Sequence, residues 1–460
     1  MRLPALLVLL CLASLAAQDR LAPVGMVDAC EAQFRQGGVG LSVAVVKGGR
    51  TVFRRGFGTT AVTDGAPVDE HTRFAIGAIT KEFTAACAFL LAEDGKLAPS
   101  DAVANWYPEL TRAADVTLLD LMQHVSGYAD YSPLDYVDAR MREPIEPDEL
   151  LRRHAGRDLD FEPGTRWSYS STNYILLGRI IEKVSGQPFG EFLRARILEP
   201  LGMSDTLYEP SGDEDRMARG HVTFALGPPE PGKPEGRGWL GAAGAIWSSA
   251  DDLAKWLAAL MGGRVVSPAS LAAMTAARTL ADGRFFEYGC GLSLGVIGER
   301  RSWGHDGGVE GFRSSSLMIP AQGIAVVVLA NIDADASDLS RKLLDLATAS
   351  AAPPPLRFDV PGPAVIDVIG ACFRAMQRGS FVGIPVTEDF GAYLTAERLA
   401  GASLRLKPFG TLGKVEVLRY GERGGMEVTI ARLAFQDAVL EASLFRRLDG
   451  RIAQFFVTKD

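Results

Sequence analysis

Cysteine and histidine are scarce in this sequence, and neither occurs in a pattern that binds metal. The chain of 460 residues has five cysteines and five histidines. The histidines form no H-E-x-x-H motif, and the cysteines lie too far apart for a zinc site or a compact disulfide scaffold. We therefore expect no metal and no cofactor. Four cysteines are expected to be buried thiols: Cys30, Cys87, Cys290 and Cys372.

Concentrated charge of one sign is also absent. The formal net charge is −8 at pH 7, but the sequence contains no block of like charges. Nucleic acid is therefore not an expected partner, because its phosphates are bound by clustered basic residues. With 47% hydrophobic and 23% charged residues, the composition is that of a globular protein with one large domain and room for a small companion.

Long apolar runs are missing after the N-terminus. There, Arg2 precedes an apolar run over residues 3–12, and small residues follow up to Ala17. This order predicts a signal peptide at residues 1–17, because a run this short does not span a bilayer. We expect a secreted or periplasmic protein without a transmembrane anchor once the signal is removed.

The rest of the chain mixes strands and helices in an α+β arrangement. Gly48-Gly49 between two runs rich in valine and phenylalanine predicts a hairpin over residues 39–58. Helical spacing of apolar residues predicts a helix from Thr80 to Asp94, with Gly95 as its cap. Strands return late in the same domain, so one sheet is expected to form from both of its ends. The further expected helices are 172–184, 189–198 and 249–260, and the further expected strands are 291–297, 314–319 and 324–329.

A change in composition near residue 351 divides the chain. The proline-rich stretch 351–363 predicts a linker, because proline lacks the backbone N–H that helices and central strands need. Before it we expect one domain over residues 18–350. After it, residues 364–460 combine an apolar helix, a second helix near 395–404 and four alternating runs. This predicts a small α+β domain that resembles the NTF2-like folds.

Five short sequence blocks resemble motifs of one enzyme family and occur in the same order as in that family. Residues 74–84 read FAIGAITKEFT, which resembles the F-x-I-G-S-x-T-K-x-F-T signature of serine β-lactamases, D-Ala-D-Ala carboxypeptidases and related esterases. The other blocks are LMQHVSGYADY at 121–131, PGTRWSYSSTNYILLG at 163–178, LGAAGAIWSSADDLAKWL at 240–257 and GHDGGVEGF at 304–312. The resemblance to this β-lactamase and penicillin-binding-protein family implies an antiparallel sheet flanked by helices, with a helical subdomain.

The position of the family's nucleophile is occupied by alanine. In the signature, serine and lysine lie three residues apart at the start of a helix, so that the amine can take the hydroxyl proton. Here this pair is Ala78 and Lys81. A methyl group cannot attack a carbonyl, and the acyl-enzyme route is closed at this position. Thr80 cannot replace the serine, because two residues turn the helix by about 200° and direct its side chain elsewhere.

The resemblance assigns the remaining site residues. Tyr169 takes the place of the tyrosine of the Y-x-N motif, the acid/base partner of the lysine, and Ser171 replaces the asparagine that contacts substrate. His305 and Gly307 take the place of the H-x-G motif on the strand at the edge of the site. The backbone N–H of Gly308 is expected to form the oxyanion hole with that of Ala78. His124 and Ser126 are expected to hold a turn beneath the site.

Three functions are consistent with these residues. The first is an exported, catalytically impaired hydrolase homologue that binds an acyl, peptide-like or ester ligand through Lys81, Tyr169 and the paired N–H groups. The second is an active serine-type hydrolase with serine at position 78 in the natural form, or with another nucleophile such as Ser171. The third is a non-catalytic binding or scaffold protein with the C-terminal domain as its interaction module. Two departures at one site, Ala78 and Ser171, favour a natural substitution over an engineered one.

Overall fold

The computed structural model describes residues 25–459 except 36, 135, 213, 281, 349–359, 361 and 437. The predicted signal peptide and most of the predicted linker lie outside these residues. Every helix among the described residues is too short or too polar to span a bilayer. The four cysteines expected to be buried thiols are buried and unpaired.

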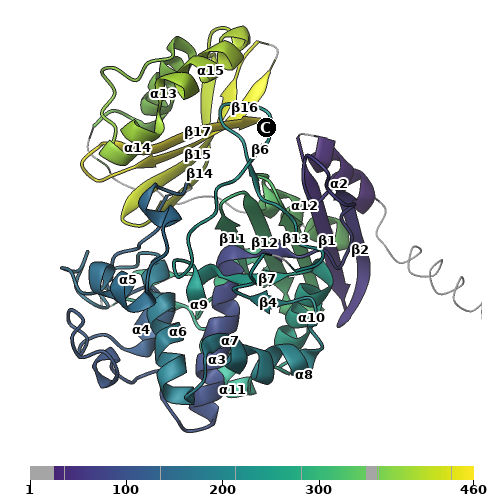
Figure 1. The fold of residues 1–460 in the computed structure, drawn as a ribbon, viewed down its shortest axis with the longest axis vertical. Coiled ribbons are helices and arrows are strands. Elements are labelled where there is room, and N and C mark those ends of the chain that lie inside the picture. Colours follow the sequence, from purple (N-terminus) through teal and green to yellow (C-terminus); the bar gives the residue numbers. More distant parts are fainter. Residues whose placement is uncertain are drawn as a thin grey trace, which may run out of the picture.

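A six-stranded antiparallel sheet organises the larger part of the chain (Figure 1). Its strand order is β10-β11-β12-β13-β1-β2, so the N-terminal hairpin pairs directly with the last strand. Leu41 lies opposite Ala330 in this pairing. The expectation of one sheet built from both ends of the domain is confirmed. The strands are β1 (Gly40–Lys47), β2 (Arg50–Gly58), β10 (Ser293–Ile297), β11 (Arg300–Val309), β12 (Phe312–Ile319) and β13 (Ile324–Ala330).

Both faces of this sheet are covered by helices. Alternate side chains of a strand point to opposite faces, and β13 is buried at every position. Val326 and Val328 pack into one hydrophobic cluster with α2 and α12, whereas Val327 and Leu329 pack into another with α3 and α10. The covering helices are α2 (Met26–Arg35), α3 (Thr80–Glu93), α10 (Ala250–Met261) and α12 (Ala336–Thr348).

Helix α3 runs through the centre of the larger unit and is buried from Thr80 to Leu91. It contacts α6 and α9, which belong to the predicted helical subdomain. The helix expected over 189–198 is divided, because α7 is followed by a π-helical segment, Arg194–Leu198. The other helices here are α4 (Leu118–Met122), α5 (Pro147–His154), α6 (Ser171–Ser185), α7 (Phe189–Leu193), α8 (Glu199–Leu201), α9 (Gly241–Gly244) and α11 (Pro268–Met274).

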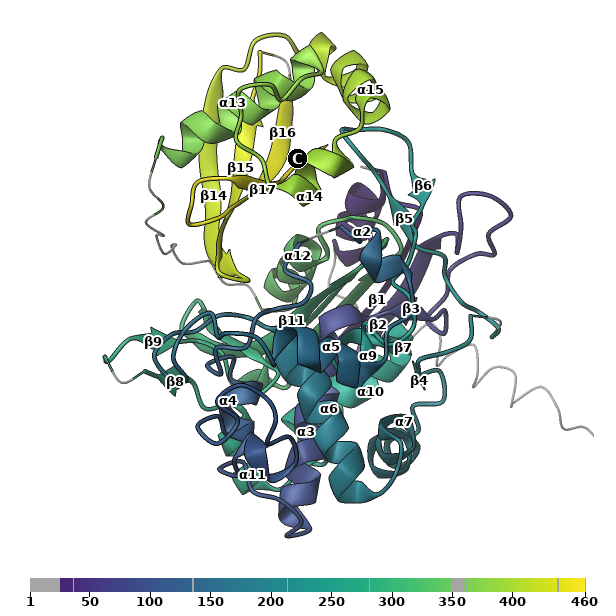
Figure 2. The same ribbon diagram turned by 60° about the vertical axis from the view of Figure 1, so that its left-hand side comes forward.

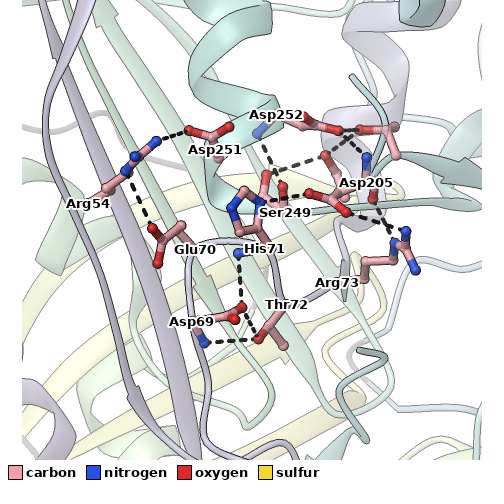
Figure 3. Close-up of polar contacts among 12 residues, drawn as sticks. Arg54, Asp69, Glu70, His71, Thr72, Arg73, Asp205, Ser249, Asp251 and Asp252 are labelled. Atoms are coloured by element: carbon pink, nitrogen blue, oxygen red, sulfur yellow. Dashed lines mark hydrogen bonds and ion pairs between the residues drawn. The ribbon is translucent and has the colours of Figure 1, made fainter. Parts of the chain in front are cut away.

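A short sheet and a polar network fix the segment that leads into α3. The sheet has the order β3-β7-β4. Before β3, the side chains of His71 and Arg73 both contact the Asp205 carboxylate, at 2.9 and 3.3 Å (Figure 3). The backbone N–H of Asp205 donates to Asp252 at the start of α10. These contacts hold the entry to α3 against α10. The short strands are β3 (Phe74–Ala75), β4 (Leu207–Tyr208), β5 (His221–Val222), β6 (Glu230–Pro231), β7 (Ile246–Ser248), β8 (Arg278–Thr279) and β9 (Phe285–Phe286).

The C-terminal residues form a second α+β unit with its own hydrophobic cluster. Its four strands pair antiparallel in sequence order, and α13 lies across the sheet (Figure 2). The predicted helices and four alternating runs are present, whereas the short α14 was not predicted. The likeness to NTF2-like folds stays a prediction. The elements are α13 (Val365–Arg378), α14 (Glu388–Tyr393), α15 (Ala396–Leu406), β14 (Lys414–Arg423), β15 (Met426–Ala434), β16 (Val439–Arg446) and β17 (Ile452–Lys459).

Candidate functional site

The site is centred on the turn that joins β3 to α3. A 3-10 helix, Gly77–Ile79, forms this turn and lies against β11. Gly77 has a φ of +50°, and a Cβ atom there would lie 2.8 Å from the backbone nitrogen of Gly308. A side chain at Gly307 would overlap the carbonyl of Ile76. Gly77 and Gly307 are therefore needed for the close packing of the turn that carries Ala78 against β11.

Ala78 lies at the opening of the site. From Phe74 to Leu91 every residue is buried except Ala78, which is partly exposed. In the serine hydrolases that this segment resembles, the corresponding position carries the nucleophile. In this chain it is the one accessible position of the segment. Thr80 is buried, and its hydroxyl accepts a hydrogen bond from the backbone N–H of Ile246. As expected, Thr80 does not replace the missing serine.

Lys81 is buried one turn along α3, with 1% of its surface exposed. Its amine donates to Ser171 Oγ at 3.3 Å and to the Ala243 carbonyl at 3.0 Å. Burial lowers the pKa of Lys81 to about 7, and the charge of Asp130 acts in the opposite direction. Near neutral pH this lysine therefore exchanges between the ammonium and the free amine, as a general base must.

Tyr169 and Ser171 flank the start of α6 and face Lys81. The Lys81 amine lies 4.9 Å from the centroid of the Tyr169 ring. The Tyr169 hydroxyl is buried and has no hydrogen-bond partner among the described residues. The structure therefore places the expected pair together through the ring face, without a hydrogen bond between amine and hydroxyl. Ser171 makes the polar contact with the lysine instead.

His305 lies on β11 and is already bonded through both ring nitrogens. Nε2 pairs with the Tyr288 hydroxyl at 2.9 Å, and Nδ1 pairs with the Asp306 carbonyl at 2.6 Å. Burial lowers the pKa of His305 to about 3, which keeps the ring neutral. The imidazole is therefore placed to shape the edge of the site, and its role in binding or catalysis stays a prediction.

A buried acid ties α3 to the strand that carries His305. The Glu82 carboxyl group accepts hydrogen bonds from Trp256 Nε1 at 2.7 Å and from Ser316 Oγ at 2.5 Å. Ser316 Oγ in turn accepts from the backbone N–H of His305. Burial raises the pKa of Glu82 to about 7. This chain of contacts fixes the distance between the Lys81 helix and the β11 edge.

His124 and Ser126 stabilise a turn beneath the site through hydrogen bonds, as predicted from the sequence. His124 has a φ of +59°, and its Nδ1 accepts a hydrogen bond from the Ser170 backbone N–H at 3.1 Å. Ser126 Oγ donates to Asn173 Oδ1 at 2.8 Å. These bonds fix the start of α6, and with it the positions of Tyr169 and Ser171.

Two charged residues near the site were not selected from the sequence. Asp130 Oδ1 accepts from the Ser171 backbone N–H at 3.0 Å, while Asp130 Oδ2 is buried without a hydrogen-bond partner in the described structure. Asp130 falls inside the block at 121–131, but the resemblance gives it no role. Burial raises the pKa of Asp130 and lowers that of Lys81, and in both cases the charge of Arg423, from the C-terminal unit, acts to lower the pKa. A Gly-Gly pair after Arg423 signals a tight hairpin, yet no local pattern indicates what that hairpin contacts.

Comparisons with known proteins give one family and a set of hydrolase relatives. The beta-lactamase family model matches residues 27–350. A D-aminopeptidase from Brucella anthropi is 29% identical over 322 residues, which is 67% of this chain and 59% of that protein. The chain thus spans less than two thirds of that relative. A D-aminopeptidase from Brucella melitensis biotype 2 is 29% identical over 436 residues, 91% of this chain and 78% of that protein.

Solved structures show the same fold. The octameric penicillin-binding protein homologue from Pyrococcus abyssi superposes with a TM-score of 0.64 at 23% identity, and the match covers 91% of this chain and 90% of that one. The D-amino acid amidase from Ochrobactrum anthropi SV3, in complex with D-phenylalanine, has a TM-score of 0.62 at 25% identity. That match covers 72% of this chain and 99% of the amidase.

Proposed function

Because this chain belongs to the beta-lactamase family, we propose that it is an exported, catalytically impaired homologue of the family's serine hydrolases. In this proposal it keeps a pocket for an acyl, peptide-like or ester ligand. Export is supported by Arg2 and the apolar run at 3–12. The mature chain is then expected to begin near Gln18, which N-terminal sequencing of the exported protein tests.

One observation carries the proposal: Ala78 occupies the accessible point of an otherwise well-formed site. Lys81 is buried within hydrogen-bond distance of Ser171 and has its pKa lowered by burial to about 7. A Cβ atom at Gly77, the residue before Ala78, would lie 2.8 Å from the Gly308 backbone nitrogen, and this close packing of the turn against β11 supports an oxyanion hole there. Such a site can hold a carbonyl group, but Ala78 has no oxygen with which to attack it.

Calorimetric titration of the chain with Ala78, called the natural chain from here on, tests the proposed pocket. The probes are N-acetyl-D-alanine, a penicillin and a simple ester, and at least one is expected to bind without being consumed. Ala78→Leu fills the opening and is expected to weaken binding at least about tenfold, or about 1.4 kcal/mol. Ala396→Leu makes the same change on the exposed face of α15 and is expected to bind normally. Absence of heat with all three probes contradicts the proposal.

A second candidate function is supported by the contact between Lys81 and Ser171. An amine with a pKa of about 7, 3.3 Å from a serine hydroxyl, is the arrangement of a nucleophile and its base. In this alternative Ser171 attacks the ligand and the protein is an active hydrolase. Slow ester turnover by the natural chain that disappears in Ser171→Ala, and persists when the exposed serine at position 100 is changed in Ser100→Ala, supports it. If turnover is unchanged in Ser171→Ala, Ser171 is not the nucleophile.

A further inference from the structure

Glu82 is a fully buried acid that follows Lys81 on α3. Burying a carboxyl group is costly unless its oxygens are bonded, and both oxygens of Glu82 have a partner. Oε2 accepts a hydrogen bond from Trp256 Nε1 of α10 at 2.7 Å, and Oε1 lies 2.5 Å from Ser316 Oγ of β12. The acid therefore joins three elements of the fold.

Ser316 connects this acid to the strand at the edge of the site. His305 and Ser316 lie opposite each other in the β11–β12 ladder. The His305 backbone N–H donates to Ser316 Oγ at 2.9 Å, and the same oxygen lies 3.2 Å from the His305 carbonyl oxygen. A displacement of Ser316 is therefore expected to move the stretch of β11 that carries Gly307 and Gly308.

The contacts of Ser316 permit two arrangements of hydrogen atoms. When Glu82 is ionised, the Ser316 hydroxyl donates to Oε1 and accepts from the His305 N–H. When Oε1 takes up a proton from solvent, the new O–H donates to Ser316 Oγ, and the Ser316 hydroxyl turns to the His305 carbonyl. A hydroxyl has one donor and two acceptor sites, so each of these contacts stays bonded in both states. Trp256 donates to Oε2 in either state.

Both states are accessible near neutral pH, because burial raises the pKa of Glu82 to about 7. The charged groups of the surrounding elements α3, α10 and β12 are bonded to other partners, and the His305 ring of β11 is neutral. These pairs are Lys81 with Ser171, Asp251 with Arg54, Asp252 with Lys255, Arg313 with Asp333, and the His305 ring with Tyr288.

We propose that Glu82 is a positioning residue of the site, which holds the β11 edge at a fixed distance from the Lys81 helix whether its carboxyl group is ionised or protonated. The direction of the bond between Glu82 and Ser316 reverses, while the contact persists. This inference rests on the proposed function, because it concerns the same pocket. The spacing between Lys81 and Gly308 then stays constant across neutral pH, while Lys81 itself changes charge.

Substitutions at Glu82 separate hydrogen bonding from charge. The amide of glutamine can donate to Ser316 Oγ and accept from Trp256 Nε1, which reproduces the protonated arrangement. Glu82→Gln is expected to bind N-acetyl-D-alanine, the penicillin and the ester within about twofold of the natural chain. Glu82→Leu has a similar size but no polar atom, and it is expected to bind at least about tenfold more weakly. Glu93→Leu replaces an exposed glutamate at the end of α3 and is expected to bind normally.

Two measurements on the full-length chain need no ligand. In infrared difference spectra, a carboxylic acid band is expected to appear as the pH falls through about 7 and to be absent in Glu82→Gln. Hydrogen exchange of the His305 amide, corrected for the intrinsic effect of pH, is expected to be equally slow on both sides of this transition. In Glu82→Leu this amide is expected to exchange at least about tenfold faster, because its acceptor is no longer held in place.

The outcomes separate this inference from the proposed function. Exchange at His305 that accelerates when Glu82 is protonated overturns the inference, as do unchanged binding and exchange in Glu82→Leu. If no probe binds the natural chain, the proposed function fails, and exchange and infrared spectra still decide the role of Glu82.

Ser316→Ala gives a second, independent test of the same contact. In the Glu82→Leu background it is expected to weaken binding no further, because the two residues act through one contact. An additional loss in the double variant contradicts this. If Glu82→Leu does not fold, Ser316→Ala alone provides the comparison, because it leaves the bond between Glu82 and Trp256 in place.

Discussion

Ala78→Ser is expected to turn the natural chain into an acylating enzyme. With a chromogenic ester, release of the leaving group is expected to rise at least about 10³-fold over the natural chain. Where nucleophile and base act as a unit, loss of the nucleophile costs on the order of 10⁶ in turnover, so its return has a large effect. Lys81 already lies one turn along the helix with a pKa of about 7. Stopped-flow absorbance measures the initial burst.

The control for this prediction is a serine that lies far from the site. Ala396→Ser makes the same change on the exposed face of α15 and is expected to leave the rate at the level of the natural chain. If Ala78→Ser is equally inactive while it melts like the natural chain, the pocket has lost more than its nucleophile. The replacement of the family's asparagine by Ser171 is then the first candidate for that further loss.

In the Ala78→Ser background, acylation is expected to depend on Lys81 and to increase as the pH rises through about 7. Burial lowers the pKa of Lys81 to about 7, so the amine becomes neutral above this pH and can take the serine proton. Lys81→Ala is expected to reduce the rate by about 10²- to 10⁴-fold, the usual contribution of a general base. Burst rates between pH 5.5 and 9 measure both effects.

Lys96→Ala is the matched control for this second prediction, because Lys96 is exposed just beyond the end of α3. Its pH profile is expected to coincide with that of Ala78→Ser alone. A flat profile across neutral pH, or an unchanged rate in Lys81→Ala, shows that another group accepts the proton. The Tyr169 hydroxyl is then the next group to test, because it is buried beside the lysine.

Local sequence patterns were sufficient to predict most of the main elements. The Gly48-Gly49 pair marks the hairpin of β1 and β2, and in the structure both glycines have positive φ. The periodic apolar residues of 80–94 mark α3, which is buried on nearly all sides. Each of these patterns involves only residues that are close together in the sequence, so it can be recognised without knowledge of the fold. The order of the five family blocks then indicated which segments meet at the site.

The features that were missed depend on contacts between distant segments. The Tyr288 hydroxyl bonds to His305 from a loop outside the recognised blocks, and this pairing decides what the histidine can do. The placement of Arg423 depends on how a hairpin near the end of the chain packs against Pro133. α14 is only six residues long and is too short for a clear helical period.

The central claim is that the pocket is preserved although its nucleophile is missing. The most direct test measures the intact mass of the mature protein after exposure to a β-lactam and to an activated acyl ester. The natural chain, Ala78→Ser and Ser171→Ala are measured side by side. The account predicts that only Ala78→Ser gains the mass of the acyl group. Labelling of the natural chain that disappears in Ser171→Ala contradicts it and identifies an active enzyme with a different nucleophile.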